Sequence, residues 1–214
     1  MYIFQPDRFL LRGQISKVAS YVTGRVLDIG AGGHDRYSNF FKYSEYVKMD
    51  VSSGENVDVV GSAEKIPFPE SSFDSLVCTQ VFEHLARPHV CASEMYRVLK
   101  KDGYAIVTVP QMNELHEEPH DFFRYTKFGL NQLFTDTGFI VVSCEQRGGF
   151  FSTVAQMKIR YCIDRYSLYK KEFLGRVFNQ IAKLIGRFAI WLDGRDRSIA
   201  NSKHTIGWCV VLKK

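Results

Sequence analysis

The chain has 214 residues, of which 45% are hydrophobic, and a formal net charge of +5. This length suits one domain with an elaboration, and the absence of any run of about 18 apolar residues argues against a membrane-spanning helix. The N-terminus lacks a basic stretch followed by a long apolar one, so we expect no signal peptide. The five cysteines lie far apart, which suggests reduced thiols in a cytoplasmic protein rather than a disulfide framework or a cysteine zinc site.

Apolar residues follow helical and strand-like spacings in alternation along most of the chain. Helical spacing occurs over 8–22, 89–103 and 126–138, and the second of these segments is expected to end at its lysines and glycine. Apolar runs bounded by turn residues predict strands. The expected strands are 25–30, 45–50, 57–61, 73–79, 103–110, 139–146 and 205–214.

This alternation predicts an α/β fold, with a doubly wound, Rossmann-like and mostly parallel seven-stranded sheet and helices on both faces. Ligands of such sheets bind beyond the carboxyl ends of the strands, near the first strand. We expect a core over 1–149, a basic helical insertion over 150–203 and a final core strand over 204–214.

The stretch VLDIGAGGHD follows the first expected strand and leads into a helix-compatible segment. Glycine lets the backbone approach a ligand closely, although the same glycines could simply turn a tight corner. A nicotinamide-binding G-x-G-x-x-G loop would need glycine where Asp35 stands. Asp50, at the end of the second strand, suits ribose hydroxyls, and Asp28 suits an ammonium group better than a pyrophosphate.

The blocks VLDIGAGGH, MD, GSAEKIPFPESSFD, VFEHL and EMYRVLKKDGYAIVTVP together resemble the class I S-adenosylmethionine-dependent methyltransferases, of the type 11 or ubiquinone-biosynthesis kind. The resemblance runs over about 24–142, with 205–214 as a final strand. The chain departs from the family at His34, where a third glycine is usual, and at Ser62, where an aspartate is usual. A serine hydroxyl can still accept from the adenine amine.

The resemblance implies S-adenosylmethionine as cofactor and S-adenosylhomocysteine as product. It places the glycine loop around the methionine portion, Asp28 at the amino group, Asp50 at the ribose and Gln80 near the transferable methyl. Ser62 and the residue after it would lie along the adenine. The positions that the resemblance assigns to the cofactor are Asp28, Gly30, Ala31, Gly32, Asp50, Val51, Ser62, Ala63, Glu64, Thr79 and Gln80.

Residues 116–120 read HEEPH and fit the zinc-protease pattern H-E-x-x-H. That pattern binds metal only on a helix, and Pro119 within a helix costs about 3 kcal/mol or more. Proline also moves Glu118 toward an extended conformation. We therefore reject the protease interpretation and expect no metal site.

The same loop follows the fifth expected strand, where an acceptor would meet the cofactor. His120 is a candidate general base and Arg124 a candidate anchor for an anionic group, with His116 and His84 as further candidates. The alternative is structural: Asp121 caps or forms an ion pair, the loop aromatics pack, and His84 packs beside the fourth strand.

Residues 147–214 carry 14 Lys and Arg against 4 Asp and Glu. Helices are expected over 153–171 and 173–192, and the second is amphipathic and basic. It could pack on the sheet or roof the cleft, lie on a membrane surface, or bind a nucleic-acid or protein partner. The apolar stripe consists of Leu174, Val177, Phe178, Ile181, Leu184, Ile185, Phe188 and Trp191.

These features predict a cytoplasmic methyltransferase that acts on a small-molecule, sugar or lipid-linked acceptor, with oxygen as the favoured acceptor atom. Peripheral membrane contact would run through 153–192. The fourth strand ends in CTQV rather than N-P-P-Y, which disfavours a nucleobase acceptor. The alternative is a catalytically silent protein that binds the cofactor, a membrane or a partner. The sequence does not predict the oligomeric state.

Overall fold

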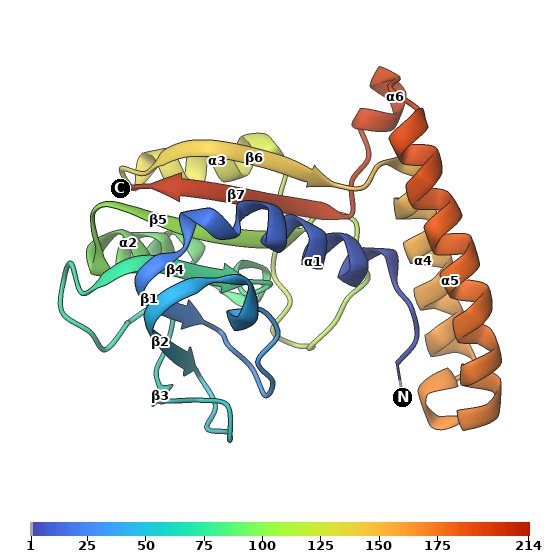
Figure 1. Ribbon diagram of the computed structural model, residues 1–214, viewed down its shortest axis with the longest axis horizontal. Coiled ribbons are helices and arrows are strands. Elements are labelled where there is room, and N and C mark those ends of the chain that lie inside the picture. The colour runs from blue at the N-terminus through green and yellow to red at the C-terminus, as the bar shows by residue number, and fades with distance from the viewer. Residues whose placement is uncertain (1) are drawn as a thin grey trace. The chain divides into compact units, whose positions relative to one another are not determined.

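The computed structural model describes residues 2–214 and contains a seven-stranded sheet with the strand order β3-β2-β1-β4-β5-β7-β6 (Figure 1). β1 pairs in parallel with β2 and β4, as do β2 with β3 and β4 with β5. β7 runs antiparallel to β5, as backbone hydrogen bonds show: the N–H of Lys214 donates to Gly103 O, and the N–H of Gln111 donates to Ile206 O. The expected mostly parallel α/β sheet is confirmed. The strands are β1 (Thr23–Ile29), β2 (Lys42–Asp50), β3 (Val59–Val60), β4 (Phe73–Thr79), β5 (Leu99–Pro110), β6 (Ile140–Arg147) and β7 (Gly207–Lys213).

Helices cover both faces of the sheet. The first face carries α2 and α3, whose buried side chains, among them Met95 and Phe134, join a core with Leu27, Val107 and other strand residues. The last turn of α1 lies over the other face (Figure 1). The helices are α1 (Pro6–Val18), α2 (Pro88–Val98), α3 (Lys127–Asp136), α4 (Phe150–Arg165), α5 (Glu172–Arg195) and α6 (Ile199–Ser202).

The expected helix over 89–103 is wrong at its C-terminal end. α2 ends at Val98, and the following Leu-Lys-Lys-Asp-Gly segment begins β5. Leu99 is fully buried and pairs with Phe73 of β4. Burial of this leucine in the sheet outweighs the helical spacing of the residues before it.

No α-helix connects β1 to β2, although the segment after the glycine loop is helix-compatible. Residues 31–41 contain a single turn of 3-10 helix at Ser38–Phe40. The carboxylate of Asp35 accepts hydrogen bonds from the backbone N–H and the hydroxyl of Ser38, at 3.1 and 2.5 Å. Such local side-chain bonds compete with helix formation.

The chain forms two compact units. One contains Ile15–Pro110, Leu115–Glu145 and Trp208–Lys214, and thus most of the sheet. The other contains the chain up to Gln14 together with Gln111–Glu114 and Gln146–Gly207. This second unit, the helical unit below, holds α4, α5 and α6. The boundary expected for an insertion over 150–203 stays a prediction, because the helical unit also takes in the N-terminal segment.

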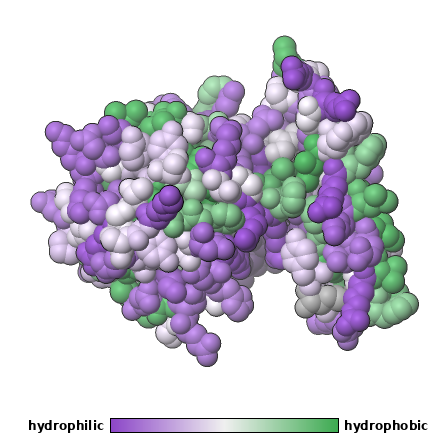
Figure 2. Space-filling model, viewed as in Figure 1, coloured by the Kyte–Doolittle hydropathy of each residue, from purple (hydrophilic) through white to green (hydrophobic). Residues whose placement is uncertain are grey.

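In the helical unit, α5 buries its small residues and exposes its large ones. The positions buried in α5 are Gly175, Ala182, Gly186 and Ala189. A Cβ atom added at Gly186 would lie 2.5 Å from the ring of Phe4, so the chain packs closely on this side. Leu184 is 73% exposed and Phe188 58%. Figure 2 shows hydrophobic residues along α5 at the surface.

Among residues 2–214, none of the helices combines the length and the apolarity that a membrane span requires.

Candidate functional site

The loop after β1 is held against the end of β2. The N–H groups of Gly30 and Ala31 both donate to the carbonyl of Met49, at 2.8 and 3.1 Å. Gly30 has a φ of 73°, and a Cβ atom there would lie 2.3 Å from Val81 Cγ2. Around Gly32, by contrast, no described residue other than its two chain neighbours has a heavy atom within 4 Å of an added Cβ. The loop is therefore anchored at its start and open further along.

Asp50 faces this loop. Its Oδ2 accepts from the backbone N–H of Gly32 at 2.9 Å, and its Oδ1 accepts from Ser52 N–H at 3.1 Å. Each carboxylate oxygen has two lone pairs, so both can accept a further hydrogen bond from a ligand hydroxyl. The end of β2 thus presents an acceptor pair next to the open part of the glycine loop.

Asp28 lies inside β1 and accepts a hydrogen bond from the hydroxyl of Tyr46, on β2, at 2.9 Å. Burial raises the pKa of Asp28 to about 7, although the Tyr46 hydrogen bond acts in the other direction. A nearby ammonium group would favour the ionised carboxylate and lower this pKa. Near neutral pH, binding of a cation beside Asp28 would therefore raise the ionised fraction of its carboxyl group.

The other predicted cofactor positions lie in turns that follow β2, β3 and β4. Val51 is 73% exposed. Ser62 Oγ accepts from the backbone N–H of Glu64 at 3.1 Å, and the Glu64 carboxylate forms an ion pair with Arg87 at 2.6 Å. This ion pair gives Glu64 a structural partner, so its predicted contact with a cofactor stays a prediction.

Thr79 ends β4, and Gln80 follows it with a φ of 55°. The Gln80 backbone N–H donates to Thr108 O at 2.9 Å, and its Nε2 donates to Thr108 Oγ1 at 3.2 Å. Because parallel strands end at one edge of a sheet, Gln80 lies at the same edge as the ends of β1 and β2. Sequence reasoning correctly grouped these turns at one edge.

The HEEPH segment is a turn rather than a helix, as its proline predicted. Glu117 has a φ of 55°, which does not occur within a right-handed helix. The ring of His116 packs edge-on against that of His84, with centroids 4.9 Å apart. His84 Nδ1 lies 2.7 Å from the backbone oxygen of His120, whose own side chain is exposed. The structure thus brings His84 and His116 together.

Arg124 is engaged within the same loop. Its guanidinium donates two hydrogen bonds to the Asp121 carboxylate, at 2.5 and 2.7 Å. The hydrogen bond from Arg124 holds the pKa of Asp121 far below its usual range, against an opposing effect of burial. The expected ion pair of Asp121 is therefore present, and the anion-binding role of Arg124 stays a prediction.

Tyr46, Glu83 and Asp121 were not identified from the sequence as site residues. Tyr46 pairs with Val26 across β1 and β2, and so lies on the same side of the sheet as Asp28, two residues further along. The register of β1 and β2 therefore predicts that Tyr46 and Asp28 lie on one side of the sheet, but the sequence alone does not give this register. Glu83 and Asp121 lie in irregular segments close to His84 and His116. Such segments have no periodic sequence pattern from which these contacts could be predicted.

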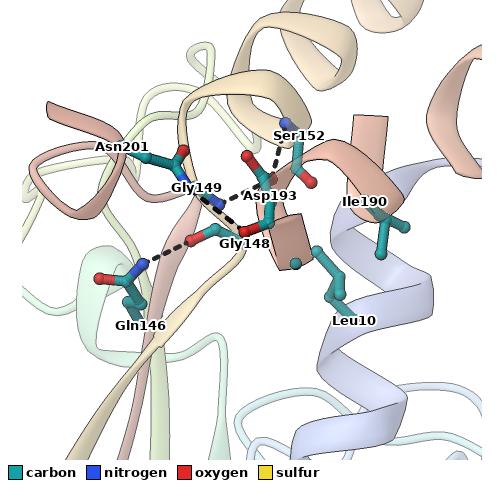
Figure 3. A pocket seen from close by; sticks show the side chains of 9 residues that line it. Leu10, Gln146, Gly148, Gly149, Ser152, Ile190, Asp193 and Asn201 are labelled. Atoms are coloured by element: carbon teal, nitrogen blue, oxygen red, sulfur yellow. Dashed lines mark hydrogen bonds between the residues drawn. The ribbon is translucent and has the colours of Figure 1, made fainter. Parts of the chain in front are cut away.

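The helical unit contains a hollow of its own (Figure 3). Asp193 of α5 accepts from the backbone N–H groups of Gly149 and Ser152 at 2.9 Å each, and from that of Phe151 at 3.0 Å. Asn201 accepts from Phe150 N–H at 2.7 Å. These side chains cap the N-terminus of α4, so their polar groups in the hollow have a structural role. None of the predicted site residues lines the hollow.

Comparison with known proteins shows which family part of the chain resembles. Residues 27–107 match the family described as "Methyltransferase domain". The uncharacterized methyltransferase YcgJ of Bacillus subtilis (strain 168) is 34% identical over 96 residues, which is 37% of this chain. The match spans 38% of the length of that relative.

Solved structures with the same fold cover nearly the whole chain. The [4+2]-cyclase SpnF has a TM-score of 0.59 at 17% identity, over 97% of this chain and 81% of its own. A phosphoethanolamine N-methyltransferase 2 of Haemonchus contortus, solved with phosphomonomethylethanolamine and S-adenosylhomocysteine, has a TM-score of 0.58 at 18% identity. It covers 95% of this chain and 52% of its own. At these low identities, the TM-scores show a shared fold only.

Proposed function

We propose that the chain is a class I methyltransferase that transfers a methyl group from S-adenosylmethionine to a hydroxyl group of a small-molecule, sugar or lipid-linked acceptor, as the match of residues 27–107 to the methyltransferase domain family supports. The observation that carries the proposal is the pairing of Asp50 with the open part of the glycine loop.

The residues at this edge fit the proposed cofactor. Gly32 and Gly33 face open space, which suits an aminoacyl chain against the backbone. The Asp50 oxygens retain acceptor capacity for ribose hydroxyls, and Asp28 offers a carboxylate for an ammonium group. When bound, S-adenosylmethionine supplies a methyl group on a positively charged sulfur. The task of the chain is to align an acceptor atom with that methyl, and alignment accounts for most of the help a protein can give.

The acceptor side is formed by the loop that contains His116 and His120. A hydroxyl acceptor loses its proton as the methyl is transferred, so a nearby imidazole can act as general base. The exposed ring of His120 and the paired rings of His84 and His116 are the candidates. This assignment of a base, like the choice of oxygen as acceptor atom, is part of the proposal.

Titration calorimetry with S-adenosylhomocysteine tests the cofactor part. We expect one site per chain with a dissociation constant of about micromolar order, which corresponds to about −8 kcal/mol. Turnover of labelled S-adenosylmethionine with panels of hydroxylated metabolites and lipid-linked glycans tests the reaction. Binding without turnover on either panel would favour the silent-protein alternative, and the cyclase SpnF shows that this fold also serves another reaction. Absence of binding would overturn the proposal.

We also propose that α5 lies on an anionic membrane surface. Its large apolar side chains are exposed along one face of the helix, and Arg176, Lys183 and Arg187 lie beside them. Phe188 and Trp191 stack at 5.6 Å, and the guanidinium of Arg195 lies 4.7 Å from the Trp191 ring centroid. An apolar stripe with tryptophan and flanking basic residues is typical of helices that lie in the lipid interface.

Flotation with liposomes tests this surface. The double substitution Leu184→Glu, Phe188→Glu is expected to lower binding to vesicles with phosphatidylglycerol by at least about tenfold, since each buried apolar side chain contributes about 1.5–3 kcal/mol. Phe128→Glu on α3 is the matched control, because Phe128 is 75% exposed and outside the stripe. Equal flotation of both variants and the unchanged chain would contradict the membrane proposal.

A further inference from the structure

Three side chains with metal-binding atoms meet beside the loop after β5. One carboxylate oxygen of Glu83, one ring nitrogen of His84 and one of His116 lie within 4.8 Å of one another. Glu83 and His84 follow β4, whereas His116 is 32 positions further along, so no local sequence motif unites them. Ligand atoms around a single ion, with bonds of about 2.0–2.2 Å, lie up to about 4 Å apart, so small rotations of these side chains close the site.

Each histidine is oriented by a group on its Nδ1 side. His84 Nδ1 lies 2.7 Å from the carbonyl oxygen of His120, which can only accept, so Nδ1 carries the proton. His116 Nδ1 lies 3.5 Å from Asp121 Oδ2. In His84 this arrangement leaves the lone pair on Nε2, and the carboxylate beside His116 Nδ1 would favour the same tautomer there. Histidines that bind metals are oriented in the same way, with the second nitrogen directed at a carbonyl or a carboxylate.

Glu83 is fixed in position by the backbone. Its carbonyl oxygen accepts from the N–H groups of Phe122 and Phe123, at 2.8 and 3.2 Å, which fastens the two loops together. The Glu83 side chain is 0% exposed, and Oε1 lies 3.9 Å from His84 Nε2. A cation at this point would neutralise a carboxylate that is fully removed from water.

We propose that Glu83, His84 and His116 bind one divalent transition-metal ion, of the Zn²⁺, Mn²⁺ or Fe²⁺ class. Two imidazoles and one carboxylate suit these ions, and three protein ligands leave coordination positions open. Mg²⁺ and Ca²⁺ prefer oxygen ligands and should bind far more weakly. This site differs from the zinc-protease interpretation of HEEPH: it uses the first histidine of that segment with partners from the loop after β4.

The ion would lie on the acceptor side of the edge where the parallel strands end. An acceptor hydroxyl bound to it would have a lowered pKa, which would ease loss of its proton. With His84 and His116 as ligands of the ion, His120 would remain as the candidate general base. This consequence rests on the proposed function, whereas the metal site itself does not.

The test uses the full chain after treatment with a chelator. Equilibrium dialysis against Zn²⁺ with elemental analysis should give about one equivalent per chain. His84→Ala and His116→Ala should each weaken binding by at least about tenfold, and Asp121→Asn by about 10–100-fold, because that carboxylate orients His116. The matched control is His89→Ala, an exposed histidine on α2.

S-adenosylhomocysteine titration and circular dichroism on the same samples separate loss of the metal from loss of the fold. Normal cofactor binding together with lost Zn²⁺ in the His84 and His116 variants supports the site. The same Zn²⁺ content in those variants as in His89→Ala, or no Zn²⁺ in the unchanged chain, overturns it. A chain that binds Zn²⁺ but not S-adenosylhomocysteine keeps the site and removes the proposed function.

Discussion

Asp50→Ala is expected to weaken binding of S-adenosylhomocysteine by about 100-fold or more. The carboxylate holds the Gly32 and Ser52 N–H groups and, in the proposed complex, the ribose hydroxyls. A hydrogen bond to a charged group contributes about 1.5–3 kcal/mol, so the loss of two such bonds to the ligand reaches this size. Calorimetric titration measures the change.

Glu55→Ala is the matched control for charge. Glu55 is exposed and lies five residues further along, in the loop between β2 and β3. We expect its affinity to stay within about twofold of the unchanged chain, since exposed charges at a distance are screened. Affinity of Asp50→Ala equal to that of Glu55→Ala would show that the end of β2 does not contact the ligand.

Asp28→Asn is expected to make the free chain more stable at pH 8 and to weaken its cofactor binding. Burial raises the pKa of Asp28 to about 7 in the folded chain, against 3.8 for an unperturbed aspartate, so the folded state binds more protons than the unfolded state between these pH values. The contribution of this group to stability therefore falls as pH rises from about 4 to 7. Asparagine has no proton to lose and avoids that decline.

The gain should be at least about 2 kcal/mol at pH 8, or a rise in Tm of about 4–8 °C, and close to zero at pH 4. Thermal unfolding at both pH values measures it. Asp35→Asn should behave in the opposite way. Burial tends to raise the pKa of Asp35, but the hydrogen bonds from Ser38 lower it overall. The ionised Asp35 therefore stabilises the fold at neutral pH, and this contribution is lost as the pH falls into the acid range. A gain for Asp28→Asn that does not depend on pH would contradict the assignment.

Much of the fold follows from periodicity alone. The buried strand β4, expected over 73–79 and found at Phe73–Thr79, contains the apolar run Leu76–Cys78 with polar residues on either side. The errors occur where a tertiary or local side-chain contact decides. Leu99 enters the sheet instead of α2, and Asp35 bonds to Ser38 instead of starting a helix after the glycine loop.

The edge proposed to bind the cofactor was predictable because parallel strands have their carboxyl ends at one edge of the sheet, so the ends of β1, β2 and β4 lie there whatever the details of the loops. The cluster of Glu83, His84 and His116 was not predictable. It depends on backbone hydrogen bonds between two irregular segments, and nothing in the spacing of those residues reports such bonds. Sequence reasoning left the orientation of α5 open, because an amphipathic stripe can face the interior, a membrane surface or a partner.

The inverted packing of α5 has a practical consequence for work with the purified protein. In buffer without lipid or detergent, the outward leucine, isoleucine and phenylalanine side chains of α5 are exposed to water. Two copies of the chain can bury these side chains by pairing along this helix. A dimer or larger aggregate seen in such a buffer should dissociate on addition of mild detergent. The apparent mass of such a species would then depend on the buffer and would not report the native quaternary state.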